Sequence, residues 1–443
     1  MENLKNLLLL VLSILLIQCS TNEKNSSENS NPSPDQITFK EIRPVNKTIS
    51  PAISKLLKSE PESRSYELDK LWTTIQNEGS PLTEKDPLYN DYVYLTFIYR
   101  DDSQNKEINF EVFGIYDEYR WGNMKMYRFM GTDLYYRCYM IPNDLCFSYR
   151  FILNDTITGE RQIVSDPLNT NLSPTGERNK YSWSVLDLRT NEPDWYTKRF
   201  DNVGSKLDTF QLTSNILNNT RDIYAYLPPD YNKAEKKYPV IYLFDSFIYL
   251  HRVEVPNTLD NLIKEGKIEP IVAVMLDNPT STSRKSELPL NLIFKQFIIE
   301  ELVPHIKNKY NITDKPEETI IGGISYGGLA STYIAFYHPD IFGNVLSQSG
   351  SFWRDLEWYD TQGDEIRGDW LINQFLTGDR KDLKIYLDWG LQENWCLSSG
   401  RKMAKVLNQK DYKFKFVEFN GWHDWSNSRK TFPEALMYLL ENE

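Results

Sequence analysis

One short stretch of the chain has the residue types and spacing for nucleophilic catalysis. The pentapeptide "GISYG", residues 323–327, lies between an apolar run, "ETIIGG", and a segment with helical character, "YGGLASTYIAFYH". A serine on a sharp strand-to-helix turn needs glycines beside it, because other side chains would collide with the strand or the helix. Its hydroxyl would then face the crevice at the carboxyl ends of the strands. We therefore predict that Ser325 is a nucleophile, and not an idle residue of a glycine-rich turn.

A serine hydroxyl is a poor nucleophile at neutral pH, so it needs a base. The chain has four histidines. His423 lies in "FNGWHDWS", directly after the last predicted strand, where the base belongs in the α/β-hydrolase order of serine, acid, histidine. The other three lie after a strand, within an amphipathic helix and at a helix end: His251, His305 and His338. We predict His423 as the base.

The acid that orients this base should follow a strand between Ser325 and His423. The segment "KIYLDWGLQENW" offers Asp388 at the strand end and Glu393 in the loop beyond it. A loop position lets a carboxylate reach the imidazole Nδ1 and stabilise the imidazolium. We favour Glu393, and Asp388 is then a strand-end residue that backbone groups satisfy.

Acyl transfer also needs two N–H donors for the oxyanion. The N–H of Tyr326, at the start of the helix, is one candidate. The second should come from the loop "LFDSF", where the N–H of Phe247 is the best placed, since this loop lies beside the nucleophile in such sheets.

The rest of the chain must position these residues, and its pattern changes along the sequence. Strand-like runs alternate with helical stretches over residues 201–443, which predicts a mostly parallel sheet covered by helices, an α/β-hydrolase fold. Residues 59–200 begin with a helical segment and continue with period-two strands, typical of a small all-β, immunoglobulin-like sandwich. Residues 20–58, rich in Ser, Asn, Pro and Lys, are expected to be a disordered tether.

The first 19 residues have the layout of a secretory signal. An apolar run from Leu7 to Ile17 follows one lysine and precedes Cys19. The run is shorter than the about 20 apolar residues that span a bilayer. "LIQC" looks like a lipoprotein cleavage box, in which Cys19 receives the lipid, although Gln18 replaces the usual small residue. We expect an exported protein anchored to a membrane through this lipid, with plain secretion or a retained anchor as alternatives.

Composition narrows the partners and cofactors. A formal charge of −12 and the lack of a Lys/Arg-rich stripe argue against nucleic acid. Four cysteines without zinc-site spacing make a metal improbable, and no cofactor is expected. Cys138 and Cys146 flank "YMIPNDL", which the pattern predicts as a hairpin turn. A cross-strand disulfide is therefore conceivable, and the sequence leaves it open.

Several of these stretches resemble the enterochelin (enterobactin) esterase family. The likeness covers roughly residues 66–443 and rests on "LWTTIQNEGSPL", "SDPLN", "STSRKSELP", "GGISYGGLASTYIAFYHPDIFGNVLSQSGSFW" and "GWHDW". The resemblance implies a serine esterase that hydrolyses ester bonds of a catecholate siderophore, a small-molecule substrate. It also implies Ser325, His423 and Glu393 as the catalytic set.

The same resemblance suggests residues near the substrate. Arg284 and Glu287 would lie by the pocket, with a surface or structural ion pair as the alternative, and Trp353 would line the cleft or belong to the core. Ser246 stands where the family usually has glycine. Feruloyl or acetyl esters of carbohydrates, acyl transfer, and ligand capture without turnover are the alternative functions, since a fold does not fix a substrate.

Overall fold

The structure is a computed structural model, which describes residues 43–44, 50–103, 105–113, 124–173, 182–189, 195–197, 204–233, 236–355 and 369–441. By contacts it divides into two compact units, residues 1–37 and 38–443, and all described residues belong to the second. The predicted signal, Cys19 and most of the predicted tether lie outside the described residues. None of the described helices has the length and apolar character needed to cross a membrane.

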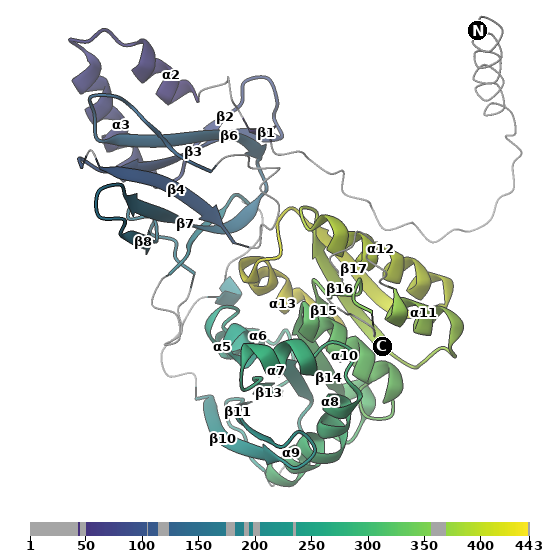
Figure 1. Cartoon of the computed structure of the whole chain (residues 1–443). Coiled ribbons are helices and arrows are strands. Elements are labelled where there is room, and N and C mark those ends of the chain that lie inside the picture. Colours follow the sequence, from purple (N-terminus) through teal and green to yellow (C-terminus); the bar gives the residue numbers. More distant parts are fainter. Residues whose placement is uncertain are drawn as a thin grey trace, which may run out of the picture. The chain divides into compact units, whose positions relative to one another are not determined.

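An eight-stranded sheet forms the framework of the C-terminal region (Figure 1). From one edge to the other its strands are β10 (Lys206–Ser214), β11 (Asn219–Leu227), β13 (Val272–Leu276), β12 (Val240–Phe244), β14 (Thr319–Ile324), β15 (Asn344–Gln348), β16 (Lys384–Gly390) and β17 (Lys413–Phe419). The pairs β10–β11 and β11–β13 are antiparallel, and all other pairs are parallel. The mostly parallel sheet of the prediction is confirmed, except that the edge strand β10 was not predicted.

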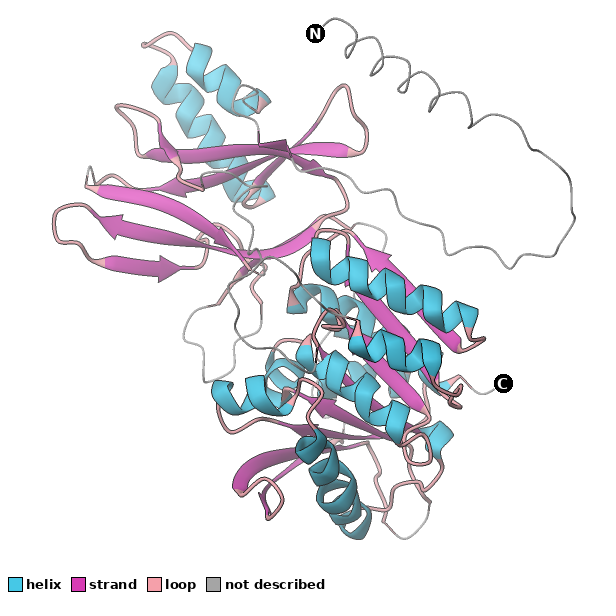
Figure 2. Cartoon of the chain, turned by 45° about the vertical axis from the view of Figure 1, so that its right-hand side comes forward, coloured by secondary structure: helices cyan, strands magenta, loops and turns pink. Residues whose placement is uncertain are grey.

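Helices cover both faces of this sheet (Figure 2), because its central strands are buried on both sides. On one face lie α8 (Leu292–Gln296), the π-helix η2 (Phe297–Leu302), α9 (Val303–Lys309), α10 (Tyr326–Tyr337), α11 (Trp370–Thr377) and α12 (Asn394–Gln409). On the other face lie α5 (Ser246–His251), α6 (Val255–Lys264) and α13 (Trp425–Leu440). Along β12, Val240 and Tyr242 face the first core and Ile241 and Leu243 the second, as strand geometry requires.

The remaining helical segments connect these elements. They are α7 (Ser281–Glu287), which follows β13, and the short 3₁₀ helices η1 (Trp195–Thr197) and η3 (Pro316–Glu318). Helix α7 begins with a capping box between Thr280 and Ser283.

Two antiparallel sheets precede this region, and we call them the N-terminal sheet pair. One contains β1 (Arg43–Pro44), β6 (Leu134–Pro142), β3 (Tyr92–Arg100), β2 (Leu82–Lys85) and β5 (Tyr127–Arg128). The other contains β4 (Lys106–Val112), β7 (Cys146–Asp155), β8 (Arg161–Val164) and β9 (Ser184–Asp187). Aromatic residues of both sheets share one core, in which Phe97 of β3 stacks on Phe110 of β4 with ring centroids 4.2 Å apart.

The structure corrects the prediction for the end of the tether. Helix α2 (Pro51–Lys58) lies within it, capped by the buried Ser50, and α3 (Arg64–Glu78) follows. Ile53 and Leu56 are fully buried against α3 and the five-stranded sheet. A tether up to residue 58 is therefore wrong, because two apolar side chains one turn apart anchor its last eight residues. The predicted boundary at residue 200 lies outside the described residues.

The hairpin predicted between Cys138 and Cys146 is also wrong. The two strands it would join, β6 and β7, have the predicted ends but belong to different sheets, so the connection crosses from one sheet to the other. Both cysteines are buried free thiols, and Thr96 donates a hydrogen bond to Cys138 at 3.3 Å. Alternation alone does not reveal which strands pair, because a strand in either sheet buries one face.

Candidate active site

Ser325 lies on a strained turn between β14 and α10, as the sequence predicts for a nucleophile. Its backbone angles, φ 60° and ψ −117°, are unusual for a residue with a side chain and cost about 1–3 kcal/mol. At Gly323, an added Cβ would lie 2.5 Å from the carbonyl carbon of Gly327. Since both groups are backbone, neither could move aside, so the turn requires glycine there. We call residues 323–327 the nucleophile turn.

The loops after four adjacent parallel strands converge at one edge of the sheet. β14, β15, β16 and β17 are neighbours in this order, and they are followed by Ser325, Ser349, Glu393 and His423 respectively. Carboxyl ends of parallel strands meet at the same edge, which is where ligands of open α/β sheets bind.

Glu393 and His423 are in direct contact. The Nδ1 of His423 lies 2.7 Å from Oε2 of the carboxylate, and the imidazole is partly exposed whereas the carboxylate is buried. The other carboxylate oxygen, Oε1, accepts hydrogen bonds from the hydroxyl of Ser349 and from the N–H of Gly390, both at 2.7 Å. This set of contacts fixes the carboxylate with one oxygen toward the imidazole. An ionised acid in this position would hold the ring and stabilise its charged form.

Asp388 has other partners. Its carboxylate accepts from the N–H of Ser349 at 3.1 Å and from the amide of Gln348 at 3.5 Å. Burial raises the pKa of Asp388 to about 7. This is the strand-end arrangement that the sequence offered as the alternative for Asp388.

The hydroxyl of Ser325 hydrogen-bonds to Ser351, with the two Oγ atoms 3.3 Å apart. Within the described part of the chain, no hydrogen bond joins Ser325 to His423. Hydrogen bonds of a catalytic base are often long in ligand-free enzymes and shorten when substrate binds. The sequence reasoning missed Ser349 and Ser351, although both lie in "VLSQSGSFW", a stretch that the family resemblance used.

The two predicted oxyanion donors lie in the first turns of helices. Tyr326 opens α10 and Phe247 is the second residue of α5, which starts after Asp245 in a left-handed conformation, φ 62°. Amides in a first helical turn have no acceptor within their own helix, and this is the helical position of both residues. The strands before these helices, β14 and β12, are neighbours.

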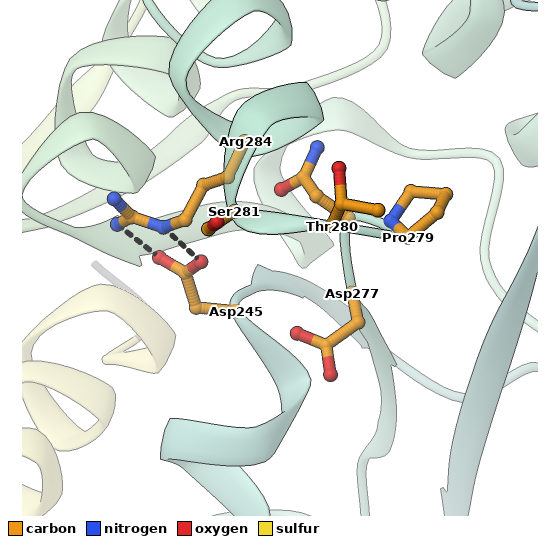
Figure 3. A pocket seen from close by; sticks show the side chains of 7 residues that line it. Asp245, Asp277, Pro279, Thr280, Ser281 and Arg284 are labelled. Carbon is orange, nitrogen blue, oxygen red and sulfur yellow. Dashed lines mark hydrogen bonds and ion pairs between the residues drawn. The ribbon is translucent and has the colours of Figure 1, made fainter.

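Arg284 lines a polar pocket of about 290 Å³, together with Asp245, Asp277, Asn278, Pro279, Thr280 and Ser281 (Figure 3). Its Nε and Nη2 bond both oxygens of Asp245, at 2.5 and 2.7 Å. The Asp245 carboxylate lies close to the nucleophile turn, since a Cβ on Gly327 would be 3.4 Å from it. The wall of the pocket that Asp245 forms is therefore next to Gly327, which is two residues after Ser325 in the chain.

Glu287 lies in a buried ion pair instead. Nη2 of Arg221 is 3.2 Å from one of its oxygens, and the amides of Asn219 and Asn278 also bond it. These contacts correspond to the structural ion pair that the sequence held open, and we assign Glu287 no substrate contact.

Three side chains lie around the ring of Tyr326, the residue after the nucleophile. Trp353, half-buried, packs on it with centroids 6.3 Å apart, and the guanidinium groups of Arg284 and Arg354 lie 5.6 and 5.9 Å from its centre. The sequence reasoning did not single out Arg354.

One group of possible metal ligands occurs among the described residues: Glu393, Cys396 and His423, with ligand atoms within 4.8 Å of one another. Burial raises the pKa of the Cys396 thiol well above its usual value, which favours the neutral form that binds metals poorly. The imidazole and the carboxylate already bond each other. The set therefore fits an acid–base pair with a buried thiol better than a metal centre.

The chain matches known esterases. A family model described as "Putative esterase" matches residues 214–439, just over half of the chain. The Iron(III) enterobactin esterase of Escherichia coli O6:H1 (strain CFT073) is 27% identical over 265 residues, 59% of this chain and 64% of that relative. This match thus spans less than two thirds of the relative's length. The Iron(III) enterobactin esterase of Dickeya dadantii (strain 3937) is 25% identical over 415 residues, 84% of this chain and 93% of that relative.

A solved structure shares the fold. The enterobactin esterase of Shigella flexneri, crystallised in the presence of enterobactin, is 22% identical and superimposes with a TM-score of 0.69. The superposition covers 84% of this chain and 97% of that one. These matches confirm the α/β-hydrolase-like esterase fold and the resemblance found in the sequence. The chain belongs to the esterase family of the matching model.

Proposed function

We propose that the protein is a serine esterase that hydrolyses ester bonds of a catecholate siderophore. Ser325 is the nucleophile, His423 the base and Glu393 the acid that orients it. One observation carries this proposal: at the edge of the sheet where Ser325 occupies its strained turn, His423 and Glu393 are paired at 2.7 Å. A buried carboxylate, a partly exposed imidazole and a serine at the same edge of the sheet have the chemistry of a catalytic triad.

The reaction follows from these roles. The Nε2 of His423 takes the proton of Ser325 as its Oγ bonds to the ester carbonyl carbon, and the carbonyl oxygen becomes an oxyanion. The N–H groups of Tyr326 and Phe247 stabilise that charge. The C–O bond to the alcohol then breaks, and the imidazolium returns its proton to the leaving alkoxide, which leaves an acyl-serine. Water, deprotonated by the same imidazole, releases the acid and restores Ser325. Both steps require Ser325 and His423 to come within hydrogen-bond distance when substrate is bound.

The surroundings of Ser325 support an aromatic, anionic substrate. The ring of Tyr326 packs on Trp353 and lies beside two guanidinium groups, Arg354 and Arg284, the second of which is also paired with Asp245. Aromatic faces pack against a catechol ring and guanidinium groups attract its oxygens. The two relatives described above are named iron(III) enterobactin esterases. Enterobactin is a catecholate ester of the proposed class.

Hydrolysis of enterobactin by the purified protein, followed by chromatography, tests this proposal. Ser325→Ala should lower the rate by about 10³-fold or more, because the acyl-serine cannot form. A fluorophosphonate probe should label the wild type at Ser325 and leave the variant unlabelled.

The same assay separates the alternatives. Turnover of feruloyl or acetyl sugars without turnover of enterobactin would replace the substrate class and keep the mechanism. A protein that binds enterobactin but is inert to the probe would be a capture protein, and the esterase proposal would fail.

Export and lipidation remain part of the proposal. They rest on the apolar run from Leu7 to Ile17 followed by Cys19. Cells that express the full chain should incorporate labelled palmitate into the protein, and Cys19→Ala should abolish the incorporation. Incorporation that is unchanged in the variant would exclude Cys19 as the lipid site.

The immunoglobulin-like class of the N-terminal sheet pair is likewise a proposal. Two antiparallel sheets that share an aromatic core support it.

A further inference from the structure

The loop that carries His423 contacts the N-terminal sheet pair on both sides of the histidine. This base loop, residues 420–424, joins β17 to α13. Trp422, one residue before His423, belongs to the core of the sheet pair and is 3% exposed. Its ring meets Phe147 of β7 edge to face, with centroids 5.4 Å apart. A side chain of the C-terminal region thus packs in the core of the N-terminal sheet pair.

Asp424, one residue after His423, bonds the same strand. Its carboxylate accepts from the N–H of Ser148 at 2.6 Å and from the Ser148 hydroxyl at 3.2 Å. The N–H of Ser426 donates to it at 2.8 Å. The carboxylate is fully buried, and burial raises its pKa. A buried carboxylate is costly unless several donors satisfy it, and here β7 supplies two of them.

Backbone contacts continue this attachment. The N–H of Cys146 donates to the carbonyl of Asn420 at 3.3 Å, and the Asn420 amide donates to Asp144 at 2.7 Å. On the opposite side, the carbonyl of Gly421 accepts from the N–H of Gln392, next to the acid Glu393, at 3.1 Å. A Cβ on Gly390 would lie 2.2 Å from this carbonyl oxygen. The base loop is therefore held between β7 and the loop that carries the acid.

We propose that the N-terminal sheet pair is a positioning element of the active site, and that Asp424 and Trp422 are positioning residues that fix the backbone around His423. The imidazole makes its side-chain contact with Glu393, so the sheet pair acts through the backbone and not on substrate. The inference rests on the proposed function, because it assigns the sheet pair a part in the same reaction.

The test uses Asp424→Asn in the full chain, with p-nitrophenyl acetate as the substrate. An amide has one N–H₂ group, so one of the backbone N–H donors, Ser148 or Ser426, must face another donor. We expect kcat to fall about tenfold or more, because the loss of one such charged hydrogen bond is of that size. KM should stay within about twofold, since no substrate contact changes. The rate of fluorophosphonate labelling at Ser325 should fall with kcat.

Asp166→Asn is the matched control. Asp166 is another buried carboxylate, bonded by the hydroxyls of Ser80 and Tyr149, and among the described residues it makes no hydrogen bond to the base loop. It should lower the thermal midpoint and leave kcat unchanged at a temperature where both variants are folded. A second variant, Asp144→Ala, removes the carboxylate that accepts from the Asn420 amide and lies in a partly exposed turn. It should lower kcat by about twofold to fivefold and is informative if Asp424→Asn fails to fold.

The outcomes separate the two proposals. If the wild type neither hydrolyses the ester nor reacts with the probe, the esterase proposal fails and this inference fails with it. If the wild type is active and Asp424→Asn and Asp144→Ala both keep the wild-type kcat, the inference alone is overturned. Equal losses of kcat in Asp424→Asn and Asp166→Asn would show a general stability effect and would also overturn it.

Discussion

The nucleophile turn and the base loop are held in place by different means. Contacts close in the sequence or within one sheet fix the nucleophile turn: the N–H of Leu329 bonds the Ser325 carbonyl, and β14 lies between β12 and β15. The base loop depends on partners far away in the sequence. Asp424 and Ser148, which bond each other, are separated by 276 positions. One catalytic group is therefore positioned locally and the other by a separate pair of sheets.

This difference has a consequence for substitutions. A change in the nucleophile turn should affect activity by distorting a strained backbone at its own site. A change in the N-terminal sheet pair should reach activity only through the base loop.

Gly323→Ala should damage the nucleophile turn most. Its new Cβ would lie 2.5 Å from the carbonyl carbon of Gly327, and neither backbone can shift without moving Ser325. We expect ester hydrolysis to fall about 10²-fold or more and the free energy of unfolding to drop by about 2–4 kcal/mol. Assays of p-nitrophenyl acetate hydrolysis and chemical denaturation measure the two effects.

The control for this substitution is Gly266→Ala. Gly266 has a positive φ, 62°, and open space surrounds its Cβ position. It should cost about 1 kcal/mol of stability and no activity. If Gly323→Ala kept wild-type turnover, the local packing account of the nucleophile turn would be wrong.

Ser349→Ala tests the attachment of the acid. The substitution removes the hydroxyl that bonds Oε1 of Glu393, and the N–H of Gly390 remains. We expect kcat to fall about tenfold with little change in KM, because the carboxylate is less firmly oriented toward His423. Ser399→Ala is the control, since its buried hydroxyl bonds only the Cys396 carbonyl in the same helix that Glu393 caps. Equal effects in both variants would mean that the Ser349 hydroxyl has no special part.

The same contrast explains which features could be predicted from the sequence. The Ser325 turn was recognisable because its constraint, glycine beside serine between a strand and a helix, is contained in five residues. The positions of Glu393 and His423 followed from chain order in a parallel sheet. Their contact with each other follows from the fold. The alternation of strands and helices in the sequence implies that fold.

Other features had no local signal. Trp422 and Asp424 are ordinary loop residues in sequence, and their partners become visible only when β7 is placed beside the base loop. Likewise, β6 and β7 alternate in the same way whether they pair with each other or with other strands. The helix α2 was missed because it has only eight residues, too few for Ile53 and Leu56 to show a clear helical period.

Substitution of Asp388 separates the roles of the two carboxylates that lie at and just after the end of β16. Asp388→Asn should leave kcat within about twofold if Glu393 is the acid, since Asp388 bonds Ser349 and Gln348 and not His423. Its effect should be on stability. Burial raises the pKa of Asp388 to about 7, so the folded chain holds a proton that the unfolded chain releases near pH 4.

Between about pH 4 and 7 the folded state thus binds more protons than the unfolded state, and this group lowers the stability as the pH rises. The neutral Asn lacks that dependence. The variant should therefore gain about 2–4 kcal/mol on the wild type between pH 4.5 and 8, measured by chemical denaturation at each pH. If the difference in the free energy of unfolding between variant and wild type were constant with pH, the pKa of Asp388 would be that of an ordinary carboxylate. A loss of kcat of about 10³-fold would mean that Asp388, and not Glu393, orients His423. The contact between the end of β16 and the base loop would then be made through Asp388.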